Sequence, residues 1–136
     1  MTHINPLPLL IALILLSNTA LASEDVIQQQ LSEYQSHGAK AFDAQRGAVL
    51  WRQSHQQIKL GKAVNCASCH STRLQDAGQH MRTGKRIEPM APSANADRFN
   101  DPKTIEKWFK RNCKWTWGRE CTAQEKGDIL TFLKAQ

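Results

Sequence analysis

Two cysteines and a histidine, closely spaced near the middle of the chain, are the residues best suited to chemistry. They form the pentapeptide Cys66-Ala67-Ser68-Cys69-His70, a Cys-x-x-Cys-His motif. Thiols at this spacing can add to the two vinyl groups of one porphyrin, and the adjoining imidazole can then bind the iron. The motif therefore predicts one covalent c-type haem, with Cys66 and Cys69 as its thioethers and His70 as its proximal ligand.

The same cysteines could instead form a redox pair or half of a zinc site. A zinc site needs a second pair of cysteines or histidines at ligand spacing, and a thioredoxin-like pair is set in a βαβ pattern. Neither pattern occurs in the sequence, which favours haem. A haem-binding His70 also needs an acceptor for its second ring nitrogen, and we expect a backbone carbonyl of residues 87–92.

The N-terminal residues predict an export signal. Residues 7–16 form an apolar run about ten residues long, too short to span a bilayer but suited to the core of a signal peptide. Ala20-Leu21-Ala22 then supplies a small-x-small cleavage site. We therefore expect a signal peptide at residues 1–22, a mature domain at 23–136 without a membrane span, and a periplasmic location. Because no Lys or Arg precedes the apolar run, an uncleaved amphipathic anchor is the alternative.

The mature domain is basic and large enough for one core. All 18 Lys and Arg residues lie beyond the signal segment, against 12 Asp and Glu. Residues 23–136 suffice for a single domain whose core includes the haem. An exported haem protein is not expected to bind nucleic acid. The positive charge either solvates the surface or forms a docking face for an acidic redox partner.

Cys113 and Cys121 are left over once the haem has its two thiols. In an oxidising compartment such a pair usually forms a disulfide, and two free thiols are the alternative. The bridge would close a short loop that carries Lys114, Trp115, Trp117 and Arg119.

Capping residues and apolar spacing predict two helices before the motif. Ser23 can cap a helix that ends near Gly38 and has an apolar stripe at Val26, Ile27, Leu31 and Tyr34. A second helix follows Asp43, and Gly47 and Trp51 share one of its faces. A glycine at that position lets another helix cross closely.

Two more helices are predicted near the C-terminus. One begins with Asp101 as N-cap and Pro102 as first residue, and has Ile105, Trp108 and Phe109 on one face. The last begins at a capping box of Thr122 and Glu125 and is the expected partner of the Gly47 helix. Residues 71–100 are predicted to be loop, and no period-two strand pattern occurs, so the predicted fold is all-α.

The order of these features resembles class I cytochrome c. In that fold the terminal helices cross through a glycine and an aromatic residue, here Gly47 and Trp51, and the last helix here ends Ile129-Leu130-Thr131-Phe132-Leu133. A narrower segment resembles the SHP (sphaeroides haem protein) family of oxygen-binding cytochromes c. It reads Arg111-Asn112-Cys113-Lys114-Trp115-Thr116-Trp117-Gly118-Arg119-Glu120-Cys121-Thr122, followed by Gln124-Glu125-Lys126-Gly127-Asp128.

The SHP resemblance implies a ligand set and a function. In that family the asparagine before the first extra cysteine is the sixth haem ligand, and the two cysteines form a neighbouring disulfide. By this resemblance Asn112 is the distal ligand and Cys113–Cys121 the bridge, and the family implies a dihaem cytochrome c as redox partner. A carboxamide binds ferrous iron poorly, so reduction should release Asn112 and let O2, CO or NO bind. From the local sequence alone, Asn112 is instead a residue that ends a helix.

Methionine and histidine are the competing sixth ligands. Met90, in Pro89-Met90-Ala91-Pro92, is a stronger candidate than Met81, although packing against the porphyrin suits both. In the predicted mature domain, the histidines outside the motif are His37, His55 and His80, and each has polar neighbours, which favours exposed positions.

These observations favour a periplasmic monohaem cytochrome c that binds a diatomic molecule when ferrous. A plain electron-transfer cytochrome with Met90 or a histidine as permanent sixth ligand is the first alternative. An enzyme that turns over a bound diatomic, for instance nitric oxide and oxygen to nitrate, is the second. Iron coordination separates the first two hypotheses, and turnover separates the third.

Overall fold

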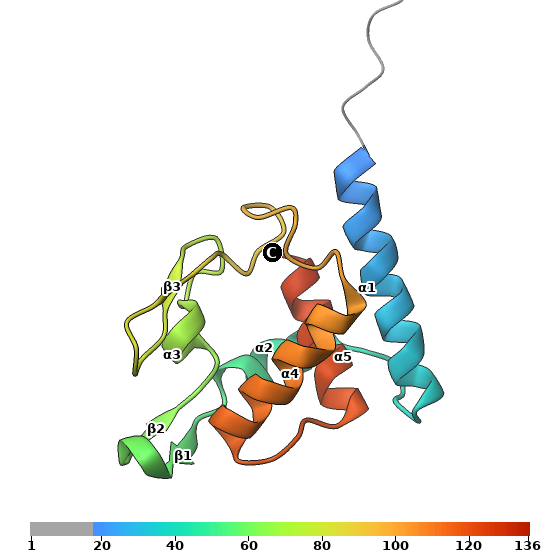
Figure 1. Ribbon diagram of the computed structural model, residues 1–136. Helices are drawn as coiled ribbons and strands as arrows, with labels where there is room; N and C mark the ends of the chain where they lie inside the picture. Colours follow the sequence, from blue (N-terminus) through green and yellow to red (C-terminus); the bar gives the residue numbers. More distant parts are fainter. Residues whose placement is uncertain (1–17) are drawn as a thin grey trace, which may run out of the picture.

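The structure is a computed structural model that describes residues 18–136 (Figure 1). Helices make up most of the fold, together with two small β-hairpins (Figure 1). The helices are α1 (Asn18–Ser36), α2 (Ala44–Arg52), α3 (Ala67–His70), α4 (Pro102–Trp117) and α5 (Ala123–Lys134), with a 3-10 helix η1 at Ile58–Leu60. The strands are β1 (His55–Gln57), β2 (Lys62–Val64), β3 (Gly78–Gln79) and β4 (Arg86–Ile87).

Helices α2 and α5 cross at Gly47, as the sequence predicts. A Cβ at this position would lie 2.6 Å from the backbone carbon of Asp128 and 2.8 Å from the Cβ of Phe132, so only glycine allows the approach. One turn further along α2, the Trp51 ring packs against Phe132 with centroids 6.3 Å apart. The crossing therefore brings α2 into contact with the last helix of the chain.

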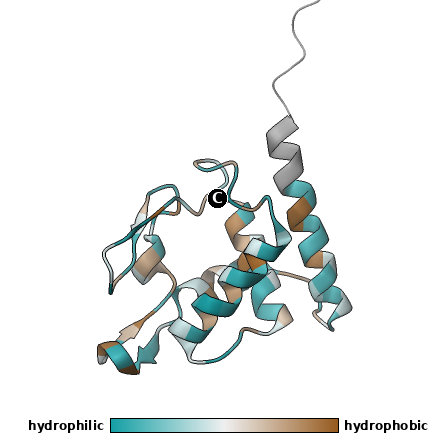
Figure 2. Cartoon of the chain, viewed as in Figure 1, coloured by the Kyte–Doolittle hydropathy of each residue, from teal (hydrophilic) through white to brown (hydrophobic). Residues whose placement is uncertain are grey.

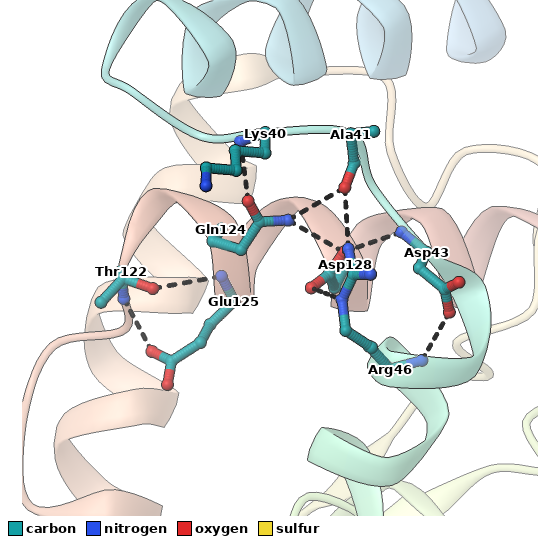
Figure 3. A network of polar contacts seen from close by, with 8 residues as sticks. All are labelled: Lys40, Ala41, Asp43, Arg46, Thr122, Gln124, Glu125 and Asp128. Atoms are coloured by element: carbon teal, nitrogen blue, oxygen red, sulfur yellow. Dashed lines mark hydrogen bonds and ion pairs between the residues drawn. The ribbon is translucent and has the colours of Figure 1, made fainter.

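A buried carboxylate joins these helices. Asp128 on α5 is 2 % exposed, and its side chain accepts hydrogen bonds from the Asp43 backbone N–H at 2.8 Å and from Arg46 Nε at 3.0 Å (Figure 3). Gln124 Nε2 donates to the same carboxylate at 3.2 Å. Because Asp43 is also the N-cap of α2, this one group fixes the start of α2 against the face of α5.

Helix α1 packs on α5 and α4 through an apolar stripe and a polar cluster. Figure 2 shows hydrophobic bands between hydrophilic ones along α1, and Ile27, Leu31 and Tyr34 are buried as expected. The Tyr34 hydroxyl donates to Glu106 of α4, and Lys126 of α5 pairs with the same carboxylate at 2.8 Å. Burial and Glu106 raise the pKa of Tyr34, so the hydroxyl keeps its proton and stays a donor.

The prediction for the start of α1 was wrong in one respect. The helix begins at Asn18, so Ser23 lies inside it and is not its N-cap. Residues 18–22 include two alanines and a leucine, which continue a helix readily. Most of the predicted signal peptide, residues 1–17, lies outside the described residues, and its cleavage stays a prediction. No helix from Asn18 onward is both long and apolar enough to cross a membrane.

The prediction of a mainly helical fold is confirmed, but four short strands occur that the sequence did not predict. Strand β1 pairs with β2 from His55↔Val64 to Gln57↔Lys62, and β3 pairs with β4 inside the segment predicted to be loop. Each strand has only two or three residues, so an alternating pattern cannot be seen in the sequence. Val64, 1 % exposed, anchors the first hairpin directly before the Cys-x-x-Cys-His motif.

We predict that Asp128→Ala lowers the free energy of unfolding by about 2–4 kcal/mol, because Arg46 and the Asp43 N–H lose their acceptor. Arg46 is half exposed and regains some hydration, which limits the loss. Urea denaturation followed by circular dichroism measures the change. The control is Asp97→Ala at an exposed position, where the change should stay within about 0.5 kcal/mol. Equal losses in both variants would contradict a special role for Asp128.

Candidate functional site

The Cys-x-x-Cys-His motif forms the short helix α3, which is fastened to the end of α2. The Cys66 N–H donates to the Trp51 carbonyl at 3.2 Å, and the Asn65 side chain donates to the Arg52 carbonyl at 3.1 Å. Asn65 and Ser68 also exchange hydrogen bonds at 3.0 Å, which closes the first turn of α3. The position of the motif is therefore set by the helix that crosses α5.

Both motif cysteines have free thiols directed away from bulk water. Cys69 is buried and Cys66 is partly buried, and neither is part of a disulfide. Burial raises the pKa of the Cys66 thiol to about 12. The two sulfurs thus stay available for bonding to another group.

The His70 side chain is partly buried, and its imidazole is neutral. Burial, with a smaller effect from Arg98, lowers the pKa of His70 to about 4. Its ring packs against Trp51 with centroids 5.5 Å apart, and its Nδ1 has no hydrogen-bond partner among the described residues. The expected acceptor in residues 87–92 is therefore not in place. A neutral imidazole beside two free thiols is the donor set that a covalent haem requires.

Gly78 allows β3 to pack directly on α3. A Cβ at Gly78 would lie 2.8 Å from the His70 Cα and 2.9 Å from the Cys69 carbonyl carbon. Gly78 lies in the segment, residues 71–100, that is predicted to be loop. No local signal distinguishes it, since the contact depends on a segment that reaches α3 from the hairpin formed with β4.

Asn112 lies in the interior of α4, not at its end. The helix continues to Trp117 and stops at Gly118, which has a φ of 70°. The interpretation of Asn112 as a helix-ending residue is therefore wrong. Helical spacing places Asn112 on one stripe with Ile105, Phe109 and Thr116, of which Ile105 and Thr116 are buried and Phe109 partly buried. The asparagine thus belongs to the interior face of α4.

The predicted disulfide between Cys113 and Cys121 is present, with its Cα atoms 5.7 Å apart. It joins the residue after Asn112 to the segment that leads into α5. The residues Lys114, Trp115 and Trp117, expected in a loop, belong instead to the last turn of α4. The helix continues here because its C-terminal glycine comes only at position 118.

Met90 is buried, and its backbone is tied to the segment that follows His70. Its N–H donates at 3.0 Å to the carbonyl of Leu74, four residues after His70 in the chain. Its sulfur accepts from the Arg98 guanidinium, with Nη2 at 2.6 Å. The Met90 sulfur is therefore already engaged by Arg98.

The three other histidines among residues 18–136 differ from one another. His37 is exposed and lies beside Glu33, and His80 accepts backbone N–H groups of its own turn through Nδ1. His55, expected to be exposed, is half-buried: its ring packs on Trp117 at 5.1 Å, and its Nε2 is buried with no partner among the described residues. The difference arises because the β1–β2 hairpin folds back onto the end of α4.

Comparison with known proteins defines the class. Residues 37–133 match a family model described as a domain of unknown function (DUF1924). The chain is 41 % identical over 121 residues to the cytochrome c-type protein SHP of Cereibacter sphaeroides, covering 89 % of this chain and 92 % of that protein. The protein is a c-type cytochrome with a helical cytochrome fold and one haem c as cofactor.

Solved structures identify the family within this class of cytochromes. The structure of oxidised SHP, an oxygen-binding cytochrome c, has a TM-score of 0.74 at 41 % identity and covers 81 % of this chain and 96 % of that chain. The solution structure of cytochrome c'' from Methylophilus methylotrophus, which concerns haem-ligand detachment, has a TM-score of 0.66 at 27 % identity over 84 % of this chain and 93 % of that chain. The chain belongs to the SHP family.

We predict that Gly78→Ala lowers the yield of haem-loaded protein and the free energy of unfolding by about 2 kcal/mol or more, because the methyl group collides with the backbone of α3. The haem-to-protein absorbance ratio and urea denaturation measure the two effects. Gly38→Ala is the control, since its Cβ would meet no atom within 4 Å although its φ of 87° adds some strain. A normal haem yield in Gly78→Ala would show that β3 can move aside.

Proposed function

We propose that the protein is a periplasmic cytochrome of the class I fold that exposes its iron to diatomic ligands on reduction. Cys66 and Cys69 hold the haem by thioether bonds, and His70 is the proximal ligand. Asn112 is the sixth ligand of the ferric state and leaves on reduction. The observation that carries the proposal is the position of Asn112 on the interior stripe of α4, directly before the disulfide.

The residues of the chain prepare the site in complementary ways. His70 is kept neutral by burial, so its nitrogen lone pair is free for a metal, and Trp51 limits the rotation of its ring. When bound, the haem would supply an iron that changes its charge by one electron and can bind O2, CO or NO. Asn112 offers a neutral carboxamide, a weak donor that suits ferric iron better than ferrous iron.

The disulfide positions Asn112 for this role. Cys113 is 6 % exposed and bonded to Cys121, so the backbone next to Asn112 is fixed to the segment that caps α5. The Thr122 and Glu125 capping box then holds that segment rigidly, with the Thr122 N–H donating to Glu125 at 2.8 Å. Release on reduction is therefore a side-chain movement of Asn112 from a helix that stays in place.

Met90 is the weaker candidate for the sixth ligand. Its backbone N–H is tied to the carbonyl of Leu74, in the segment that follows His70. Its sulfur is also engaged by Arg98. Packing near the proximal side suits these contacts better.

A second candidate is a plain electron-transfer cytochrome in which His55 binds the iron permanently. The buried, unpartnered Nε2 of His55 favours it, because such a nitrogen is rare unless a ligand or water meets it. Imidazole binds ferrous iron well, so this coordination would survive reduction and exclude carbon monoxide. The ligand that the iron keeps when reduced therefore decides between the two functions.

The proposed cytochrome exchanges electrons with another protein. Release of Asn112 requires a reductant, and the family resemblance implies a dihaem cytochrome c in that role. The chain has 18 basic and 12 acidic residues, and this positive net charge favours an acidic partner.

Attachment is tested by removing the donors. Cys66→Ser combined with Cys69→Ser should yield protein without covalent haem, and His70→Ala should lose stably ligated haem although both thiols remain. Haem staining after denaturing electrophoresis and extraction into acidified organic solvent measure attachment. Ala67→Ser, between the two cysteines, should keep full attachment. Wild-type haem that enters the organic phase would contradict the thioether assignment.

The sixth ligand is tested with Asn112→Val, which removes the amide while roughly keeping its size. The ferric spectrum should change from low-spin to high-spin, whereas the ferrous spectrum should barely change, because the amide has already left. Dithionite-reduced wild-type protein should be high-spin and bind carbon monoxide completely.

Met90→Leu and His55→Phe are the matched controls for the sixth ligand, and both should keep the wild-type ferric spectrum. If either control changes that spectrum while Asn112→Val does not, the assignment to Asn112 is wrong. If reduced wild-type protein is low-spin and ignores carbon monoxide, the electron-transfer function takes its place.

A further inference from the structure

Helix α4 carries a face of positive charge opposite its interior stripe. Lys103, Lys107, Lys110 and Lys114 recur at helical spacing and are exposed, about half a turn around the helix from Asn112. Lys114 pairs with Glu120 at 3.0 Å. Lys103, Lys107 and Lys110 form no ion pair with any described side chain, so their charges are free to meet a partner.

Trp108 borders these lysines and is one of few large apolar side chains on the surface. Its spacing predicts that Trp108 shares one face of the helix with Ile105, but its side chain is 48 % exposed. Arg111 lies over its ring at 5.0 Å and Lys107 at 5.9 Å. We call the set Lys103, Lys107, Trp108, Lys110 and Arg111 the α4 basic face.

A cavity adjoins the α4 basic face on the side of α5. It has a volume of about 510 Å³, and its charged lining residues are Lys103, Lys107, Lys110, Lys126, Glu106 and Glu120. Four lysines against two glutamates leave this lining with two positive charges in excess. Glu106 is already engaged by Lys126 at 2.8 Å, so the cavity favours acidic groups from outside.

The chemistry of this face fits a protein partner. Tryptophan and arginine are enriched where protein interfaces concentrate their binding energy, and an exposed ring already stacked by cations loses little freedom on docking. Surrounding lysines increase the rate of encounter with an acidic surface. Trp108 also lies one helical turn before Asn112, so the face reaches the border of the candidate site.

We infer that the α4 basic face is the docking surface for an acidic redox protein. This inference rests on the proposed function, since it locates the electron exchange that releases Asn112. In the exchange the partner loses one electron and the ferric iron gains it. No bond between the proteins forms or breaks, and no proton is transferred between them.

The experiment uses the haem-loaded protein and reduced flavodoxin, an acidic one-electron donor, as the probe. The anionic flavin hydroquinone becomes the neutral semiquinone when it gives up its electron. For Lys107→Glu with Lys110→Glu, the second-order rate constant at low ionic strength should fall about tenfold, and added salt should slow wild-type protein to a similar rate. Calorimetric titration of oxidised protein with oxidised flavodoxin should show a matching loss of affinity.

Matched variants in the first hairpin distinguish this surface from net charge. Lys59→Glu with Lys62→Glu makes the same charge change at exposed positions and should alter the rate less than about twofold. Trp108→Ala should raise the dissociation constant about tenfold, whereas Ile58→Ala, at a side chain 89 % exposed, should leave it unchanged. Equal losses in both lysine pairs, or an unchanged dissociation constant in Trp108→Ala, would overturn the inference.

A small donor and a lipid surface serve as further probes of the α4 basic face. Lumiflavin semiquinone, a small neutral donor, should reduce all variants at the wild-type rate. If it cannot reduce wild-type protein, the proposed redox function fails rather than the docking surface. Binding to phosphatidylglycerol vesicles that needs Trp108 and equals the binding to flavodoxin would make the face a membrane contact and overturn its assignment to a protein partner.

Discussion

The close crossing of α2 and α5 is the constraint on which the rest of the structure depends. Gly47 provides the space, and the buried Asp128 carboxylate fixes the rotation and depth of the two helices. Trp51, one turn along α2, holds the backbone of Cys66 through its carbonyl and the ring of His70 through its indole. The start of α5 is joined to α4 by the Cys113–Cys121 bridge. A change in the geometry of this crossing would therefore displace both His70 and Asn112.

Helix α4 serves two surfaces with different requirements. Its interior stripe includes Asn112, a residue that competes for backbone hydrogen bonds and weakens a helix compared with alanine. The N-cap at Asp101, Pro102 in the first turn and the disulfide near the last turn offset this weakness. Asn112 has a low helix propensity, yet it lies inside a well-capped helix. Such residues are expected at functional sites, where function and local structural preference disagree.

The main helices could be predicted because their signals are local. Asp43, Asp101 and Thr122 cap the helices that the sequence assigned to them, and the capping box with Glu125 is present. What could not be predicted depends on distant segments. Trp108 matches the apolar spacing of Ile105, yet no described element covers it. Gly78 resembles an ordinary loop glycine until β3 meets α3. His55 has polar neighbours in sequence, but its hairpin folds onto Trp117.

The unpartnered polar atoms of the interior show why these distant contacts exist. Nδ1 of His70 and Nε1 of Trp51 are buried in two rings that pack on each other, and the same is true of Nε2 of His55 and Nε1 of Trp117. None of these atoms has a hydrogen bond to the described residues. Burying a donor or acceptor without a partner costs about 1–3 kcal/mol, so side chains alone would not favour two such pairs. The arrangement becomes reasonable when the haem c of this family completes the core. A chain that holds haem c folds around a group larger than any side chain, so its own side chains do not have to satisfy every buried polar atom.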